Sequence, residues 1–171
     1  NGMAGGEALA NVLANDLLNG SPVNPADIVL AFISSTSPNV TLNVTTGAVN
    51  VAPGTPAGTY YLVYEICEVI NPGNCDQATV TVLVLPAPIV ANNDLGQSII
   101  GMTGGQSLTN VLTNDLLNGL AINPADITLS FIGSNNPGIT LDLLSGAVNV
   151  APGTPAGVYE LIYEICEILN P

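Results

Sequence analysis

Residues 52–75, APGTPAGTYYLVYEICEVINPGNC, decide the fold, because this one stretch contains a loop, a long strand, a turn and two cysteines. The proline and glycine residues of APGTPAG exclude a helix, since proline fixes φ and glycine supplies conformations that other residues avoid. Beyond them, Tyr60, Leu62 and Tyr64 alternate with residues that point to the opposite face. This period of two predicts a long strand over residues 58–69 with one face more buried than the other.

The same stretch recurs at residues 151–171, and the recurrence covers most of the chain. Residues 2–72 align with residues 101–171 without a gap, and 47 of these 71 positions are identical. The period of 99 residues is about the size of a small β-domain with its own core. We therefore predict two domains, repeat 1 at residues 1–86 and repeat 2 at residues 87–171.

Alternating apolar residues predict further strands on both sides of the long one. In repeat 1 they cover about residues 7–13, 28–34, 40–42, 48–51 and 76–85, and in repeat 2 about residues 95–101, 106–112, 126–132, 138–142, 146–150 and 157–168. Residues 1–20 also carry helical spacing, but Thr109 and Thr113 in the second copy favour a strand.

The number and spacing of these strands predict the architecture. Seven strands per 99-residue repeat, with turn signals between them, are typical of a two-sheet sandwich. The sequence therefore predicts an all-β fold of tandem two-sheet sandwich modules. Compared with a full period, repeat 1 is expected to lack its first strand and repeat 2 its last, so that the chain is interpreted as part of something longer.

The charge balance excludes several classes of function. The chain has no Lys, Arg or His and 13 acidic residues, which give a formal charge of −13. Nucleic-acid binding needs cations that replace the phosphate counterions, so this class of partner is excluded. Without His or Lys, no ordinary base is present for a Ser, Thr or Cys nucleophile, and we predict that the chain is not an enzyme.

A high apolar content does not make this a membrane-spanning chain. Hydrophobic residues make up 47% of the sequence, but Pro, Gly and Asn break them into short runs. No run approaches the ~20 residues that a spanning helix needs. We expect no direct insertion into a membrane.

Several motifs resemble those of bacterial Ig-like and cadherin-like tandem repeats in giant secreted surface adhesins or filaments of the Bacteroidetes type. The motifs are VANNDLGQSI, NVLTNDLLNG, SGAVNV, APGTPAGVYELIYEIC and ATVTVLV, and the resemblance covers essentially the whole chain. The resemblance implies that the sandwich modules are Ig-like with Greek-key connections. It also implies an exported, non-enzymatic stalk or filament module at the bacterial cell surface. It also implies a tyrosine corner, in which Tyr60 and Tyr159 hydrogen-bond back to the preceding loop.

Cys67 and Cys75 flank a predicted hairpin turn, and in an exported protein this placement predicts a disulfide that closes the turn. Cys166 corresponds to Cys67, and the chain reaches Pro171 before the position of an equivalent partner, so we expect Cys166 to be unpaired. The alternative is that all three cysteines are reduced. The seven-residue spacing without His is poor for zinc.

Asp16, Asp94, Asp115 and Asn93 are the candidates for a calcium site, because calcium binds six to eight oxygen ligands. The resemblance to cadherin-like repeats directs attention to the module junction near Asp94. The alternative is that these residues close Asx turns with their own side chains. No DxDxDG-type loop is present to decide between the two.

The sequence thus favours a structural repeat of an extracellular bacterial adhesin or filament. Its expected partners are neighbouring repeats of the same chain or neighbouring subunits in a filament. The alternative is a glycan- or protein-binding module that uses exposed sandwich loops, although five Tyr, two Phe and no Trp offer few rings for sugar stacking. Glu65 and Glu68 cannot form a glycosidase pair, since residues three apart on a strand face opposite sides.

Overall fold

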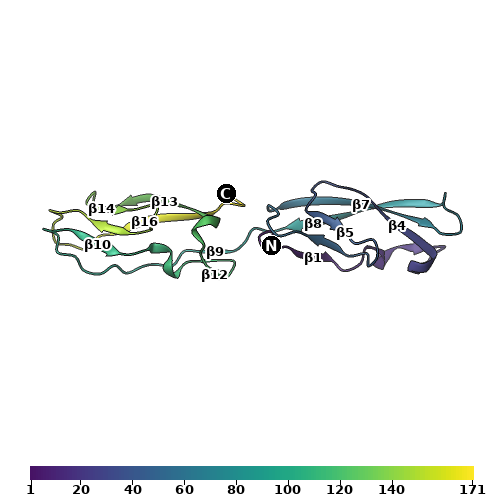
Figure 1. Cartoon of the computed structure of the whole chain (residues 1–171), viewed down its shortest axis with the longest axis horizontal. Coiled ribbons are helices and arrows are strands. Elements are labelled where there is room, and N and C mark those ends of the chain that lie inside the picture. The colour runs from purple at the N-terminus through teal and green to yellow at the C-terminus, as the bar shows by residue number, and fades with distance from the viewer. The chain divides into compact units, whose positions relative to one another are not determined.

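The computed structural model describes all residues, Asn1–Pro171, and consists of β-strands and four short 3₁₀ helices. The prediction of an all-β fold is confirmed. The chain divides into two compact units, unit 1 at Asn1–Pro86 and unit 2 at Ala87–Pro171 (Figure 1). The structure contains no helix of the length and apolar character that crossing a bilayer requires.

Unit 1 contains eight strands and two 3₁₀ helices. They are β1 (Gly6–Leu9), η1 (Val12–Asn15), β2 (Leu17–Leu18), β3 (Ser21–Pro22), η2 (Pro25–Asp27), β4 (Ile28–Ser35), β5 (Val40–Leu42), β6 (Val49–Val51), β7 (Gly58–Glu68) and β8 (Cys75–Val84). All pairings are antiparallel, and the sheets have the orders β4-β7-β8, β1-β6-β5 and β2-β3.

The core of unit 1 lies between the two three-stranded sheets. Val40 and Val49 from one sheet and Leu62 from the other are at most 1% exposed. The buried cluster consists of Val12, Leu13, Ile28, Val40, Val49, Val51, Leu62, Tyr64, Val82 and Val84. Because both sheets and η1 contribute to one cluster, the unit is a β-sandwich.

Unit 2 repeats this plan with a different set of edge strands. Its elements are β9 (Ile89–Val90), β10 (Gly105–Leu108), η3 (Val111–Asn114), β11 (Leu116–Leu117), β12 (Leu120–Ala121), η4 (Pro124–Asp126), β13 (Ile127–Ser134), β14 (Ile139–Leu141), β15 (Val148–Val150) and β16 (Leu161–Glu167). The sheets have the orders β13-β16, β10-β15-β14 and β12-β11-β9, so β16 pairs with β13 alone and β9 pairs with β11.

The long hairpin of β7 and β8 agrees with the sequence prediction. Leu62 and Tyr64 are buried, whereas Tyr61 between Tyr60 and Leu62 is 48% exposed. On β8, Val82 and Val84 are each 5% exposed and Leu83 between them is 68% exposed. Period-two patterning alone was therefore sufficient to assign the inner face of both strands.

Three sequence predictions need correction, and the first concerns the strand predicted at residues 7–13. β1 ends at Leu9, and the chain then forms η1. The Asn11 side chain caps this helix by accepting a hydrogen bond from the Leu13 backbone N–H at 2.9 Å. Val12 and Leu13 are consecutive and both buried, which the one-sided alternation of the predicted strand does not allow. The second copy repeats this arrangement in β10 and η3.

The second correction concerns the segment predicted as a strand at residues 95–101, which is irregular. One backbone hydrogen bond, from the Gln97 N–H to the Ser107 carbonyl at 2.8 Å, joins it to β10. Leu95 is 95% exposed and Ile100 is 75% exposed, so the apolar residues that indicated a strand do not face a sheet partner. The strand of this region lies earlier, at β9.

The third correction concerns β4, whose alternation predicts that Ile28, Leu30 and Phe32 share a buried face. Phe32 does lie in step with the other two, directly opposite the buried Tyr64 of β7, but it is not buried itself. Ile28 is 8% exposed, but Phe32 is 46% exposed. The β4–β7 register shifts directly after Phe32, between Phe32 and Ser34, and such a bulge bends the strand at this point. The same shift occurs in β13, where Phe131 is 44% exposed.

Candidate functional sites

A tyrosine on the central strand β7 links this strand to the 3₁₀ helix η1 of unit 1. The Tyr64 hydroxyl lies 2.8 Å from an Asp16 carboxylate oxygen and 3.2 Å from the Val12 carbonyl. Tyr64 is 4% exposed, and burial together with the Asp16 carboxylate raises the pKa of its phenol. The hydroxyl therefore remains protonated and ties β7 to η1 across 48 residues of sequence.

Unit 2 repeats this contact in a more acidic setting. The Tyr163 hydroxyl lies 3.0 Å from Asp115 Oδ2 and 3.2 Å from Asp94 Oδ2, and the carbonyls of Asn92 and Val111 are within 3.4 Å. Asp115 is completely buried, and the Asn92 backbone N–H donates to its other oxygen at 2.7 Å. One hydroxyl proton thus faces four acceptor oxygens.

This arrangement raises the pKa of the Asp94 carboxyl group. Burial raises the pKa of Asp94, the Asp115 charge raises it further, and the Tyr163 hydrogen bond partly opposes both. Two carboxylates that share one hydroxyl proton in a partly buried site favour the uptake of a proton or a cation. In unit 1 the Tyr64 hydroxyl contacts only one carboxylate, that of Asp16. No pair of carboxylates there favours the uptake of a proton or a cation.

The structure places the predicted calcium residues in three different situations. Asp94 and Asp115 converge on Tyr163, while Asp16 lies in unit 1 on Tyr64. Asn93 contributes its backbone carbonyl, which accepts from the Asn114 side chain at 3.1 Å. The oxygens around Tyr163 are of the type that calcium prefers, two carboxylates and backbone carbonyls, so the fit to calcium concerns unit 2 alone.

Cys67 and Cys75 are joined by a disulfide, and their Cα atoms are 4.1 Å apart on directly opposed positions of β7 and β8. Glu65 completes a group of three potential metal ligands within 4.8 Å of one another. Because the two sulfur atoms are bonded to each other, neither offers a thiolate to a metal. The pair therefore closes the hairpin.

Glu68 organises the turn beside this disulfide. Its carboxylate accepts from the Asn71 amide at 2.8 Å and the Asn74 amide at 3.1 Å, and these two hydrogen bonds lower the pKa of Glu68. The backbone adds a hydrogen bond from the Glu68 N–H to the Asn74 carbonyl at 3.0 Å. The sequence analysis excluded Glu68 from a glycosidase pair with Glu65 and did not find this role.

The equivalent residues of unit 2 have different partners. Cys166 is a free, half-buried thiol. Glu167 is 4% exposed, and its Oε2 accepts from the Asn170 amide at 2.8 Å and the Ala87 N–H at 3.4 Å. Its Oε1 has no hydrogen-bond partner, and a buried unpaired acceptor is costly.

The tyrosine corners form in both units. The Tyr60 hydroxyl donates to the Pro56 carbonyl at 2.8 Å, and the Tyr159 hydroxyl donates to the Pro155 carbonyl at 2.7 Å. Thr55, a residue that the sequence analysis did not single out, is completely buried and donates to the Ala52 carbonyl. Each corner is therefore held by two side-chain hydroxyls.

A close backbone approach, which occurs in both repeats, completes the corner of unit 1. The Gly2 carbonyl accepts from the Gly54 and Thr55 backbone N–H groups at 2.9 and 3.1 Å. A Cβ on Gly2 would lie 1.8 Å from the Thr55 carbonyl oxygen, and the repeat shows 2.0 Å for Gly101 and Thr154. Only glycine fits at these two positions.

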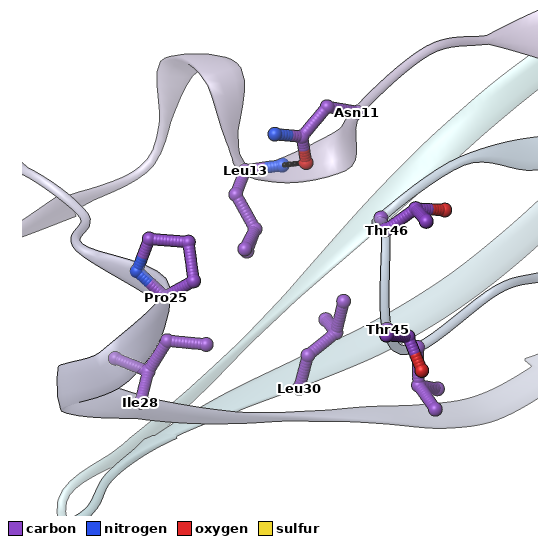
Figure 2. Close-up of a pocket in the computed structure, with 9 residues that line it drawn as sticks. Asn11, Leu13, Pro25, Ile28, Leu30, Thr45 and Thr46 are labelled. Carbon is purple, nitrogen blue, oxygen red and sulfur yellow. Dashed lines mark hydrogen bonds between the residues drawn. The ribbon is translucent and has the colours of Figure 1, made fainter.

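The concave sites are small. The pocket in Figure 2 has a volume of about 110 Å³, and Leu13, Pro25, Ile28 and Leu30 turn toward it while Thr45 and Thr46 lie at its rim. Drug-sized ligands occupy roughly 300–1,000 Å³. A second hollow of about 180 Å³ lies between the start of the chain and the end of β8.

Comparison with known proteins gives structural similarity only. No protein-family model matches the chain, and no curated protein matches its sequence. Three similar solved structures contain protocadherin extracellular domains, and the chain covers 29–40% of their length. They are protocadherin gamma B2 cadherin domains 3–6 (TM-score 0.34, 15% identity, 82% of this chain and 38% of that chain), the protocadherin gammaB4 extracellular domain (0.35, 13%, 96% and 29%) and the protocadherin gammaB7 EC3-6 cis-dimer (0.35, 15%, 85% and 40%).

Proposed function

We propose that this chain is a structural repeat module of an extracellular bacterial surface adhesin or filament, and that it acts as a stalk or fibre building block. The observation that carries the proposal is the use of the same side chains for internal cohesion in both units. The tyrosine corner and the tyrosine–aspartate contact recur at a period of 99 residues. Its partners are then neighbouring repeats or neighbouring subunits.

The cohesion of such a module comes from packing and hydrogen bonds. The sequence contains no Lys, Arg or His, so no side-chain ion pair can form. The hydrogen bond between Tyr64 and Asp16 instead joins β7 to the end of η1, and a disulfide closes the β7–β8 hairpin. The absence of Lys and Arg also removes every site for trypsin-like proteases, which suits a module outside the cell.

The alternative function is a glycan- or protein-binding module. Its main difficulty is the use of the tyrosines, because the hydroxyls of Tyr60, Tyr64, Tyr159 and Tyr163 all bind groups within their own unit. Tyr61 is the remaining tyrosine, and it is 48% exposed. A single exposed ring offers little stacking surface for a sugar.

Two measurements on the 171-residue protein distinguish these functions. Single-molecule pulling between its termini should show two separate unfolding events, with the larger force from unit 1, whose hairpin is covalently closed. A glycan array should give no binding above background. Saturable binding of one glycan class that is lost in Tyr61→Ala would instead establish the binding module, and unfolding without mechanical resistance would contradict the stalk.

We also propose that the acidic cluster of unit 2 binds calcium through Asp94 and Asp115, with the Asn92 carbonyl beside them. The support is the single hydroxyl proton that faces two carboxylates. Ligand binding to the folded state raises its stability by mass action. Calcium should therefore raise the Tm of unit 2 and leave unit 1 unchanged, and Asp94→Asn should remove the response. An identical Tm with calcium and with chelator would reject the site.

A further inference from the structure

The outward face of the β7–β8 hairpin in unit 1 gathers three side chains that carry metal-binding atoms. Successive residues of a strand point to opposite faces, so Glu65 and Cys67 of β7 share the face of the exposed Tyr61. Cys75 of β8 lies directly opposite Cys67. The Glu65 carboxylate and the two sulfur atoms lie within 4.8 Å of one another. The register of the hairpin thus brings three potential ligands together.

The hairpin also removes the objection that the sequence raised against a metal site. Along the chain, seven residues separate the two cysteines, and this spacing is poor for zinc. In the structure the Cα atoms of Cys67 and Cys75 are 4.1 Å apart, because the turn folds the chain back and pairs the two residues across the sheet. Their proximity follows from strand pairing rather than from sequence spacing.

A hydrogen bond across the hairpin orients the Glu65 carboxylate. Gln77 lies opposite Glu65 on β8, and its Nε2 donates to Glu65 Oε1 at 2.9 Å. Glu65 Oε2 lies 3.5 Å from the Cys67 sulfur. One carboxylate oxygen is therefore held by Gln77 and the other faces the sulfur pair. Hydrogen bonds of this kind orient the ligands of metal sites and raise their affinity.

The disulfide controls whether the two sulfurs can act as ligands. A small dithiol can reduce it by two thiol–disulfide exchange steps, in which two electrons and two protons pass to the protein and the dithiol becomes a cyclic disulfide. The remaining β7–β8 pairs hold the register on the side of the hairpin that leads away from the turn. Cys67 and Cys75 therefore stay opposite each other as thiols, with Glu65 beside them.

We propose that the reduced Cys67–Cys75 pair, together with Glu65, is a binding site for a thiophilic divalent cation such as Zn²⁺. Two thiolates and one carboxylate suit the tetrahedral preference of this ion and leave its fourth position to water. Binding releases the two thiol protons to the solvent. No basic side chain competes for these anionic ligands, since the sequence has no Lys, Arg or His. The site goes beyond the stalk role, because it adds a class of ligand and a redox condition.

The site can be tested in the 171-residue protein with Cys166→Ser, in which Cys67 and Cys75 are the only cysteines. A water-soluble phosphine reduces the pair, takes the oxygen atom of one water molecule as the two thiols form, and is removed before metal is added. Titration with Cd²⁺ should then produce an ultraviolet thiolate-to-metal charge-transfer band that saturates at one ion per chain. Zn²⁺ should displace Cd²⁺ from the site, and the unreduced protein should show no band.

Three further variants test the assigned ligands in this background. Cys75→Ser should abolish the saturable band. Glu65→Gln should weaken Cd²⁺ binding at least about tenfold, and Gln77→Ala, which frees the carboxylate, should weaken it about tenfold. Asp76→Asn is the matched control, because it removes one negative charge next to Cys75 but on the opposite face of β8, and it should leave the affinity nearly unchanged.

Thermal unfolding gives a second readout that does not depend on the absorption band. A bound ion stabilises the folded state by mass action and closes the hairpin in place of the covalent bond. Zn²⁺ should therefore raise the Tm of reduced unit 1 and leave the Tm of unit 2 unchanged. The unreduced protein should show no Zn²⁺ response in unit 1.

Four results would overturn the proposal. The first is the absence of a saturable band although a thiol assay finds two thiols per chain. The second is a stoichiometry of two chains per ion, which would show that the metal bridges separate molecules. The third is equal weakening in Glu65→Gln and Asp76→Asn, which would remove Glu65 from the site. The fourth is the loss of β-structure by circular dichroism on reduction alone, since the pair would then not stay in register.

Discussion

The two units contain the same side chains in different surroundings. Leu62 is completely buried and Leu161 is half-exposed, while Asp115 is completely buried and Asp16 is not. Unit 1 therefore buries its leucine more completely, and unit 2 buries its aspartate more completely. Identity at 47 of 71 aligned positions did not fix burial, because burial depends on strands outside the shared stretch.

The strands that differ explain both contrasts. β8 covers β7 in unit 1, and its valines bury Leu62. In unit 2, β9 pairs with β11. The chain that follows β9 covers Asp115, and the Asn92 backbone N–H donates a hydrogen bond to its carboxylate. The comparison shows that an edge strand controls the burial of residues on its neighbour. Matched substitutions in the two units can test this directly.

The largest effect is expected from truncating the central leucine. Leu62→Ala should lower the free energy of unfolding of unit 1 by about 2–5 kcal/mol, the range for a buried leucine. Leu161→Ala should cost about half as much, since part of this side chain is already in water. Urea unfolding followed by hydrogen exchange and mass spectrometry reports each unit separately. Equal costs would contradict the role assigned to β8.

Reduction of the disulfide should destabilise unit 1 alone. The chain-entropy model gives less than the ~3 kcal/mol of a 15-residue loop for the short loop between Cys67 and Cys75. The Tm of unit 1 should fall on reduction and that of unit 2 should not, as measured by calorimetry. Cys166→Ser serves as the control and should change neither transition. A mass that does not increase on reduction would show that the disulfide is absent.

Removal of the tyrosine hydroxyls should affect unit 2 more than unit 1. Tyr163→Phe leaves the completely buried Asp115 without one of its two donors, at a cost of about 1–3 kcal/mol. Tyr64→Phe should cost about 1 kcal/mol or less, because water can reach the half-buried Asp16. Chemical denaturation of both variants measures the difference. A larger loss in Tyr64→Phe would reverse the expected order.

The smallest effect is the opposite pH response of two carboxyl groups. The folded-state pKa of Glu68 lies below its ordinary 4.5, so its contribution is present above that value and is lost as the pH falls through the folded pKa. The folded-state pKa of Asp94 lies above its ordinary 3.8, so its contribution is present below that value and is lost as the pH rises through the folded pKa.

The two responses can be measured by NMR titration of each side-chain carboxyl. Asp142 must be followed as well, because the backbone N–H groups of Leu144 and Ser145 lower its pKa and give unit 2 an acid-sensitive contribution of its own. Asp94→Asn and Glu68→Gln should each remove that residue's contribution to the pH dependence of the free energy of unfolding. Midpoints for Glu68 and Asp94 that both lie at the ordinary values would contradict this prediction.

The features missed by sequence reasoning were mostly local. Asn19-Gly20 is a strong hairpin signal, and both residues have positive φ (53° and 76°), as a type I′ turn requires. The sequence analysis assigned no turn to this pair, so the β2–β3 hairpin was overlooked. Leu95 and Ile100 caused the opposite error, because they indicated a strand where the chain is irregular. Apolar residues in a loop carry no information about sheet pairing.

The sequence by itself determined the all-β class, the repeat of 99 residues and the inner faces of β7 and β8, since these follow from period-two alternation and from identity between the copies. It also determined that no side-chain ion pair can exist. Only the tertiary structure decided that Asp94 and Asp115 meet on Tyr163 and that Glu167 is buried with an unpaired oxygen. Those contacts join residues far apart in the chain, and their burial depends on which strand covers each sheet edge.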